Sequence, residues 1–130
     1  MSLTISPGGS VPTYVSEAFL QNAAASTGNG TSATVDARTQ EIYVWIQGAS
    51  TPSATLILEW SPDGGSTWLA AYAADLLNTA LTLVNSVVIA STTAQRFRWS
   101  PPPGATNVRT RISVFVSGTI TAKYVERRLV

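Results

Sequence analysis

From residue 31 onward, apolar and polar side chains alternate in short runs that are separated by turn-forming residues. A period of two puts successive side chains on opposite faces, which is typical of β-strands with one covered face. The predicted strands are residues 32–38, 41–48, 56–61, 67–73, 87–90, 94–100, 108–116 and 119–127. Residues 75–78 could begin a short helix, but no 3.6-residue period continues there. The pattern therefore predicts an all-β fold, an antiparallel, jelly-roll-like β-sandwich of about eight strands.

The strongest local signal is a hairpin over residues 56–72, with its turn at Asp63-Gly64-Gly65. Asp can bond to its own backbone, and Gly reaches positive φ without a clash. The alternation on these strands and on residues 94–100 places Trp60, Trp68 and Trp99 on the inward side. We expect these rings to pack inside the protein.

The cleanest alternation covers residues 108–116 and places four apolar side chains on one face: Val108, Ile112, Val114 and Val116. Ser117-Gly118 then turns the chain into residues 119–127. On that last strand we expect Ile120, Ala122 and Tyr124 to point inward.

The N-terminal part differs from the rest, because Pro7-Gly8-Gly9-Ser10 and Pro12 interrupt any regular element. We divide the chain into an N-terminal arm, residues 1–25, and a single β-sandwich domain, residues 26–130. Two interpretations of the arm stay open. It is either a first strand with irregular surroundings, or a segment that becomes ordered against a neighbouring subunit.

The composition fits a largely covered β protein, since charged residues make up only 12% of the 130 residues, against about 25% on average. The chain contains neither histidine nor cysteine. A Ser-His-Asp triad and thiolate metal sites are thereby excluded. The N-terminal residues do not read as a secretory signal, and no apolar run is long enough for a membrane helix. We expect synthesis in the cytosol, with no membrane partner.

The net charge of +1 conceals an uneven distribution. Residues 1–95 carry six acids and one base, whereas residues 96–130 carry seven bases and one acid. In the interpretation that we favour, late strands lie beside early ones and the charges neutralise across the sheet. The alternative is a basic face that binds an acidic partner.

Catalytic chemistry is not indicated. Glu41, Glu59 and Asp63 show no spacing that would pair two carboxylates for glycoside hydrolysis. We therefore expect a protein that is not an enzyme and needs no cofactor or metal. Nucleic-acid binding is also disfavoured, because it calls for a strongly basic surface with accessible aromatic residues.

An alternative use of the aromatic residues is carbohydrate or receptor binding, since flat aromatic faces stack on sugars. Trp45 shares a strand face with Tyr43 and is the best candidate for an exposed or interfacial ring. Packing in the core or at a subunit interface is the more common role of tryptophan.

Two motifs resemble those of small β-sandwich proteins in the virions of tailed bacteriophages. The first is the hairpin Leu58-Glu59-Trp60-Ser61-Pro62-Asp63-Gly64-Gly65-Ser66-Thr67-Trp68, preceded by Thr27-Gly28-Asn29-Gly30-Thr31. The second is the ending Val108-Arg109-Thr110-Arg111-Ile112-Ser113, followed by Ser117-Gly118-Thr119-Ile120-Thr121-Ala122. The resemblance covers roughly residues 27–125, and such domains occur as capsid decoration (cement) proteins and as head or tail appendages.

The resemblance implies a cement protein that binds the outer capsid surface and stabilises the shell. Its partners would be the major capsid protein and further copies of itself in a homotrimer. It would be made in the host cytoplasm and be located in the virion. The alternative is a carbohydrate- or receptor-binding module of a tail or head appendage. The candidate contact residues are Tyr14, Phe19, Leu20, Trp45, Arg96, Arg98, Arg109 and Arg111.

Overall fold

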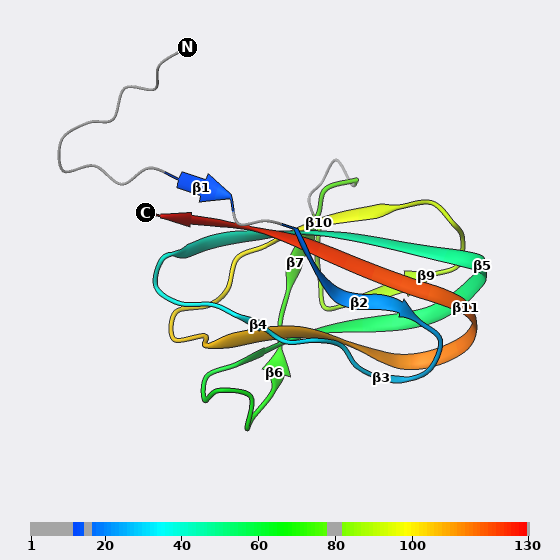
Figure 1. The fold of residues 1–130 in the computed structure, drawn as a ribbon, viewed down its shortest axis with the longest axis horizontal. Coiled ribbons are helices and arrows are strands. Elements are labelled where there is room, and N and C mark those ends of the chain that lie inside the picture. The colour runs from blue at the N-terminus through cyan, green and yellow to red at the C-terminus, as the bar shows by residue number, and fades with distance from the viewer. Residues whose placement is uncertain (1–11, 15–16, 78–81, 130) are drawn as a thin grey trace, which may run out of the picture.

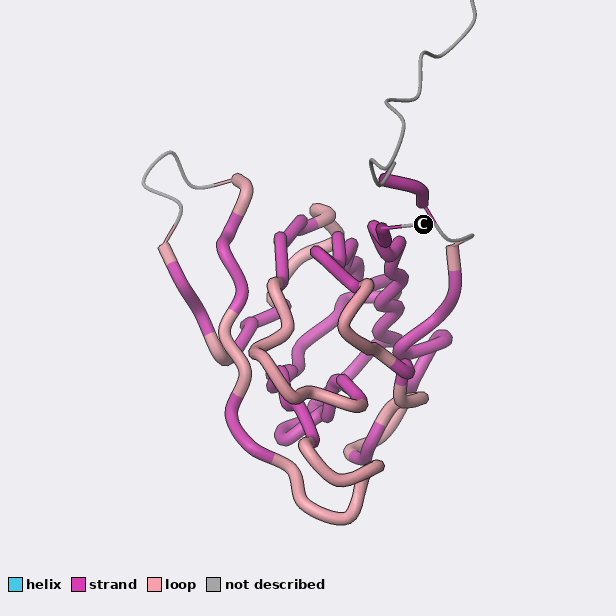
Figure 2. The backbone as a smooth tube through the Cα atoms, turned by 90° about the vertical axis from the view of Figure 1, so that its left-hand side faces the viewer, coloured by secondary structure: helices cyan, strands magenta, loops and turns pink. Residues whose placement is uncertain are grey.

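The structure, a computed structural model, describes residues 12–14, 17–77 and 82–129, and every regular element in this part is a strand (Figure 1). The strands are β1 (Pro12–Tyr14), β2 (Ala18–Ala24), β3 (Gly28–Asn29), β4 (Ala33–Thr34), β5 (Thr39–Ser61), β6 (Leu69–Ala70), β7 (Ala73–Asp75), β8 (Leu83–Val84), β9 (Ser86–Ile89), β10 (Gln95–Trp99) and β11 (Asn107–Leu129). The backbone in Figure 2 shows only strands and loops, and no described helix could span a membrane. The all-β, antiparallel prediction is confirmed.

Two long strands, β5 and β11, form the centre of the sheet and pair with each other from end to end. Each of them joins two of the strands expected from the sequence. Figure 1 shows both doubling back at the same end of the molecule. The first half of β5 pairs with the second half of β11, and the second half of β5 with the first half of β11.

The remaining strands extend this pair on both sides. The main path of the sheet runs β1-β11-β5-β10-β7-β8, while β2, β3 and β4 also pair with β11, and β6 and β9 with β5. The described strands thus belong to one continuous, open sheet. The finer expectation of a jelly-roll sandwich is not shown, because no second sheet separates from the first among these residues.

The bend in the sheet depends on close backbone packing at its corner. Ser50 and Thr51 adopt φ of 58° and 55°, and Gly118 adopts 81° on the facing strand. A Cβ added at Gly118 would lie 2.5 Å from the carbonyl oxygen of Ala49 and 2.7 Å from the Cα of Pro52. Glycine therefore allows the two strands to bend together at this point.

The core lies between the bent halves of the sheet. Its largest fully buried side chains include Trp99 and Phe97 of β10, Ile42 and Ile46 of β5, and Ile120 of β11. These residues occupy alternate positions of their strands, as the period of two predicts. Trp99 is fully buried, which confirms that its ring points inward, and Trp60 is partly buried and packs against the core. Trp68 does not join the core but lies under the guanidinium of Arg109.

A bulge in β11 corrects the prediction that four apolar residues share one face. Ile112 pairs with Leu56, but Val114 pairs with Thr55. From one pair to the next, β11 therefore moves on by two residues while β5 moves on by one. Such an insertion reverses the alternation beyond it. Val114 and Val116 are consequently 52% and 69% exposed, whereas Ile112 is buried.

The predicted hairpin is present, although its loop spans residues 62–68 and its return strand β6 has only two residues. Asp63 organises the loop: its Oδ1 accepts hydrogen bonds from the Thr67 backbone N–H and the Ser61 hydroxyl, both at 2.8 Å. The Ser61 hydroxyl in turn accepts the Gly65 N–H at 2.8 Å. These hydrogen bonds, led by those from Thr67, lower the pKa of the Asp63 carboxyl.

The segment assigned to the arm contributes β2 to the sheet. Within β2, Leu20 is fully buried in the core of its own chain, and Gln21 donates to the Thr110 carbonyl oxygen at 3.2 Å. A domain boundary at residue 25 would separate β2 from β11, the strand with which it pairs. Residues 1–11 and 15–16 of the arm lie outside the described part of the chain.

We expect Gly118→Ala to lower the free energy of unfolding by roughly 2–4 kcal/mol, because it combines an unfavourable φ with a backbone clash. Gly64→Ala is the matched control, since Gly64 also has a positive φ, 75°, but its added Cβ would meet nothing within 4 Å. The control should cost about 1 kcal/mol. Chemical denaturation of both variants measures the difference, and equal losses would contradict the close approach at the corner.

We expect Asp63→Asn to destabilise the protein at neutral pH, because the carboxylate charge strengthens the hydrogen bonds of the loop. A lowered pKa contributes stability above the ordinary pKa, about 3.9, that is lost as the pH falls through the lower folded value. The unfolding free energies of the wild type and the variant should therefore converge below about pH 4. A difference that stays constant from pH 7 to pH 2 would contradict this role of Asp63.

Candidate functional site

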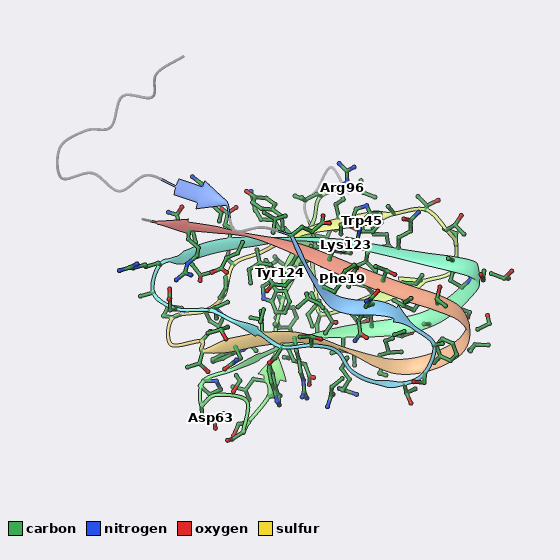
Figure 3. All side chains as sticks on the ribbon, in the orientation of Figure 1. Phe19, Trp45, Asp63, Arg96, Lys123 and Tyr124 are labelled. Atoms are coloured by element: carbon green, nitrogen blue, oxygen red, sulfur yellow. The ribbon has the colours of Figure 1, made fainter. Side chains whose placement is uncertain are left out.

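Four outward-facing side chains align across neighbouring strands β2, β11, β5 and β10. Phe19 pairs with Lys123, Lys123 with Trp45, and Trp45 with Arg96. We call these four residues the cross-strand row. Figure 3 shows them close to one another on this part of the sheet, with Asp63 at a distance. The row forms because buried residues such as Val44 alternate with the outward-facing ones.

Lys123 lies between the two aromatic rings of the row. Its Nζ is 5.4 Å from the centroid of Phe19 and 5.2 Å from that of Trp45. It also forms an ion pair with Glu17 at 3.6 Å. Contacts of a cation with aromatic faces are favourable within about 6 Å. The lysine therefore contacts both rings and has part of its charge balanced by Glu17.

The row borders a hollow of about 460 Å³. Its walls combine aromatic and charged groups, among them Tyr43, Trp45, Arg96, Lys123 and Glu17. Ligand sites in proteins are concave and largely apolar, with a few polar groups that fix the orientation of the ligand. This hollow has that composition.

The floor of the hollow is closed backbone. β5 is hydrogen-bonded to β10 on one side and to β11 on the other, and β11 lies between β5 and β2. The peptide groups at this point are used within the sheet. A molecule in the hollow would consequently be recognised by side chains.

Arg96 and Arg98 are exposed residues of β10, and neither forms an ion pair with a carboxylate in the described part of the chain. Arg96 lines the hollow. Arg98 pairs with Tyr43 in the next row and does not line it. Of the candidate contact residues, the structure therefore brings together Phe19, Trp45 and Arg96.

Arg109 and Arg111 belong to a different cluster, on the outer face of the other half of the sheet. Their Nε atoms lie 3.0 Å and 3.3 Å from Oε1 of Glu59. The guanidinium of Arg109 also stacks over the ring of Trp68 at 4.0 Å. Acids of the first part and bases of the last part thus pair across the sheet, as the favoured interpretation of the charge distribution predicted.

Two further candidates lie elsewhere. Tyr14 is part of β1, and its backbone pairs with that of Arg127 in β11. The structure does not describe the side chain of Tyr14. Leu20 is fully buried and presents no surface to another molecule in this fold.

The other large hollow, about 610 Å³, lies between the loops around residues 35–39 and 101–106. Half of its lining residues are proline or alanine. Its one acid, Asp36, is held by Arg128 at 2.6 Å, and hydrogen bonding to the Arg38 backbone N–H lowers the pKa of its carboxyl. Within the described residues, no three histidine, cysteine, aspartate or glutamate side chains gather where they could hold a metal ion.

Lys123 and Glu17 are site residues that the sequence did not single out. The only sign of Lys123 in the sequence is the alternation of residues 119–127, which places its side chain on the outward face. Its position between Phe19 and Trp45 depends on the pairing of three strands that are far apart in the chain.

Comparison with known proteins supports the fold. No protein-family model and no curated protein matches the sequence. Among solved structures, the chain resembles the SPBc2 prophage-derived protein YomS with a TM-score of 0.75 and 19% identity, covering 97% of this chain and 99% of YomS. It also resembles the PBSX exported protein XepA with a TM-score of 0.74 and 12% identity, covering 98% of this chain.

The chain spans 45% of the XepA chain, so it corresponds to less than half of that protein. At these levels of identity the likeness shows a common fold. The resemblance to phage β-proteins inferred from the hairpin and the C-terminal motif is supported at this level.

We expect Arg109→Gln to lower the free energy of unfolding by roughly 1–3 kcal/mol, because it removes a charge-assisted hydrogen bond from a Glu59 side chain that is only 13% exposed. Arg98→Gln is the control on an exposed arginine with no ion pair among the described residues, and it should change stability by less than about 0.5 kcal/mol. Thermal unfolding of the two variants checks this. Equal losses of stability in the two variants would show that the ion pair between Arg109 and Glu59 does not stabilise the fold.

Proposed function

We propose that this chain is a structural protein of a phage virion, a decoration protein that binds the outer capsid surface and stabilises the shell. The observation that carries the proposal is the shared fold, over nearly the whole length of both chains, with a prophage-derived protein. The sequence motifs that resemble virion β-proteins support the same conclusion. The absence of histidine and cysteine from the sequence agrees with a binding role.

A strip of exposed valines supplies the docking surface in this proposal. Val88 of β9 and Val114 of β11 both pair with Thr55 of β5, which lies between them, and their exposures are 65% and 52%. Val116 continues the strip toward the corner. Apolar groups that are gathered on one exposed face mark sites of interaction with other proteins. We call Val88, Val114 and Val116 the valine strip and assign the major capsid protein as its partner.

The stabilisation would follow from mass action, since a protein that binds only the assembled shell raises the stability of that shell. Many copies bind in parallel on one particle, so that modest individual contacts suffice. The proposal includes a homotrimer, and sedimentation of the purified protein measures the number of copies directly.

We expect the double variant Val88→Asp/Val114→Asp to remain folded, because both side chains are more than half exposed, and to lose its binding to capsids. Phage heads are heated with no added protein, with the wild type and with the variant. The wild type should raise the temperature at which the shell opens, and the variant should not.

Leu83→Asp is the matched control, since Leu83 is 66% exposed and lies on β8, away from the strip. This control should stabilise the heads as the wild type does. An unchanged shell with the wild-type protein would refute the decoration role. If the double variant stabilises the heads as well as the wild type does, the valine strip is not the docking surface.

A further inference from the structure

We propose that the hollow beside the cross-strand row is a binding site for an acidic saccharide, with a sugar ring stacked on Trp45 and its carboxylate bound by Arg96. This site lies on the half of the sheet opposite the valine strip along β5 and β11. It is therefore a second surface, independent of the proposed capsid contact.

The aromatic part of the site is contacted by Lys123. Trp45 is half-buried, borders the hollow and is supported by Lys123 at 5.2 Å from its centroid. A half-buried ring in such a contact offers a flat apolar face to the C–H groups of a sugar at a reduced cost in side-chain entropy. Phe19, 42% exposed on the other side of Lys123, extends the aromatic surface.

The charges of the site suit a single carboxylate. Lys123 is partly balanced by Glu17 at 3.6 Å. Arg96 borders the hollow and has no ion pair with a described carboxylate, so that its guanidinium is available to a ligand. Guanidinium groups bind carboxylates through two parallel hydrogen bonds. The hydroxyl of Tyr43, which donates to Glu41 at 2.6 Å, adds a polar group to the wall.

The position of the hollow favours a sugar over an acidic peptide. Extended peptides bind sheets by pairing with a free edge, but the hollow lies above β5 and β11, whose backbones pair on both sides. A nucleic acid would need several cations along a track, whereas this site has Lys123, partly balanced by Glu17, and Arg96, which has no described carboxylate partner. A volume of about 460 Å³ suits one or two sugar units.

The test is calorimetric titration of the full chain with three disaccharides that contain glucuronate, galacturonate or N-acetylneuraminate. A neutral disaccharide with glucose in place of glucuronate and a hexaglutamate peptide serve as comparison ligands. We expect at least one acidic disaccharide to bind about tenfold more tightly than the neutral one, the effect of one charge-assisted hydrogen bond.

Two variants separate the roles of the residues. Arg96→Gln should abolish the preference for the acid while weak binding of the neutral sugar remains, and Trp45→Ala should weaken both ligands about tenfold or more. Arg98→Gln, on the same strand but outside the hollow, is the control and should leave both affinities unchanged. Circular dichroism and thermal unfolding establish that each variant is folded.

The proposal is overturned if none of the three acidic disaccharides binds more tightly than the neutral one. It also fails if Arg96→Gln and Arg98→Gln have equal effects, or if hexaglutamate binds at the row more tightly than every sugar. Arg96→Gln should still stabilise heated phage heads, so that failure at this site and failure of the decoration role give different results.

Discussion

The pairing of β5 with β11 is the constraint on which the rest of the structure depends. These two strands provide the central ladder, and the other strands except β7 and β8 pair directly with one of them. Because both strands bend at the same place, one ladder forms both walls of the core. The corner at Ala49–Pro52 and Gly118 is therefore as important to the fold as any group of buried side chains.

The two outer faces that result are chemically different. On one half of the sheet, the cross-strand row combines aromatic rings with cations around a hollow. On the other half, Glu59 forms ion pairs with two arginines, and the valine strip lies beside them. A chain with few charged residues thus places Arg96, which has no described carboxylate partner, beside an aromatic ring, and uses Arg109 and Arg111 to connect β11 to β5. This division separates residues that stabilise the sheet from residues that remain available to a ligand.

Local alternation was sufficient to predict the strand class and much of the core. Ile42 and Ile46, and Phe97 and Trp99, are buried as a period of two requires. The same rule was wrong for Val114 and Val116, because a bulge is set by the partner strand and leaves no mark in the alternation itself. The cross-strand row could be predicted only in part: Trp45 was recognised as an outward ring, but the lysine beside it follows from tertiary register.

The long separation in sequence between β5 and β11 has a kinetic consequence. Leu58 pairs with Thr110, and Ile42 with Glu126, so the central ladder joins residues that lie 52 and 84 positions apart in the sequence. Folds dominated by such distant pairings close large loops before they gain contacts, and they fold slowly, in milliseconds to seconds. During synthesis, β5 leaves the ribosome long before β11 exists and exposes an apolar strand with two unpaired edges. Newly made copies of this chain would thus accumulate most safely where they are protected from one another until their last strand is complete.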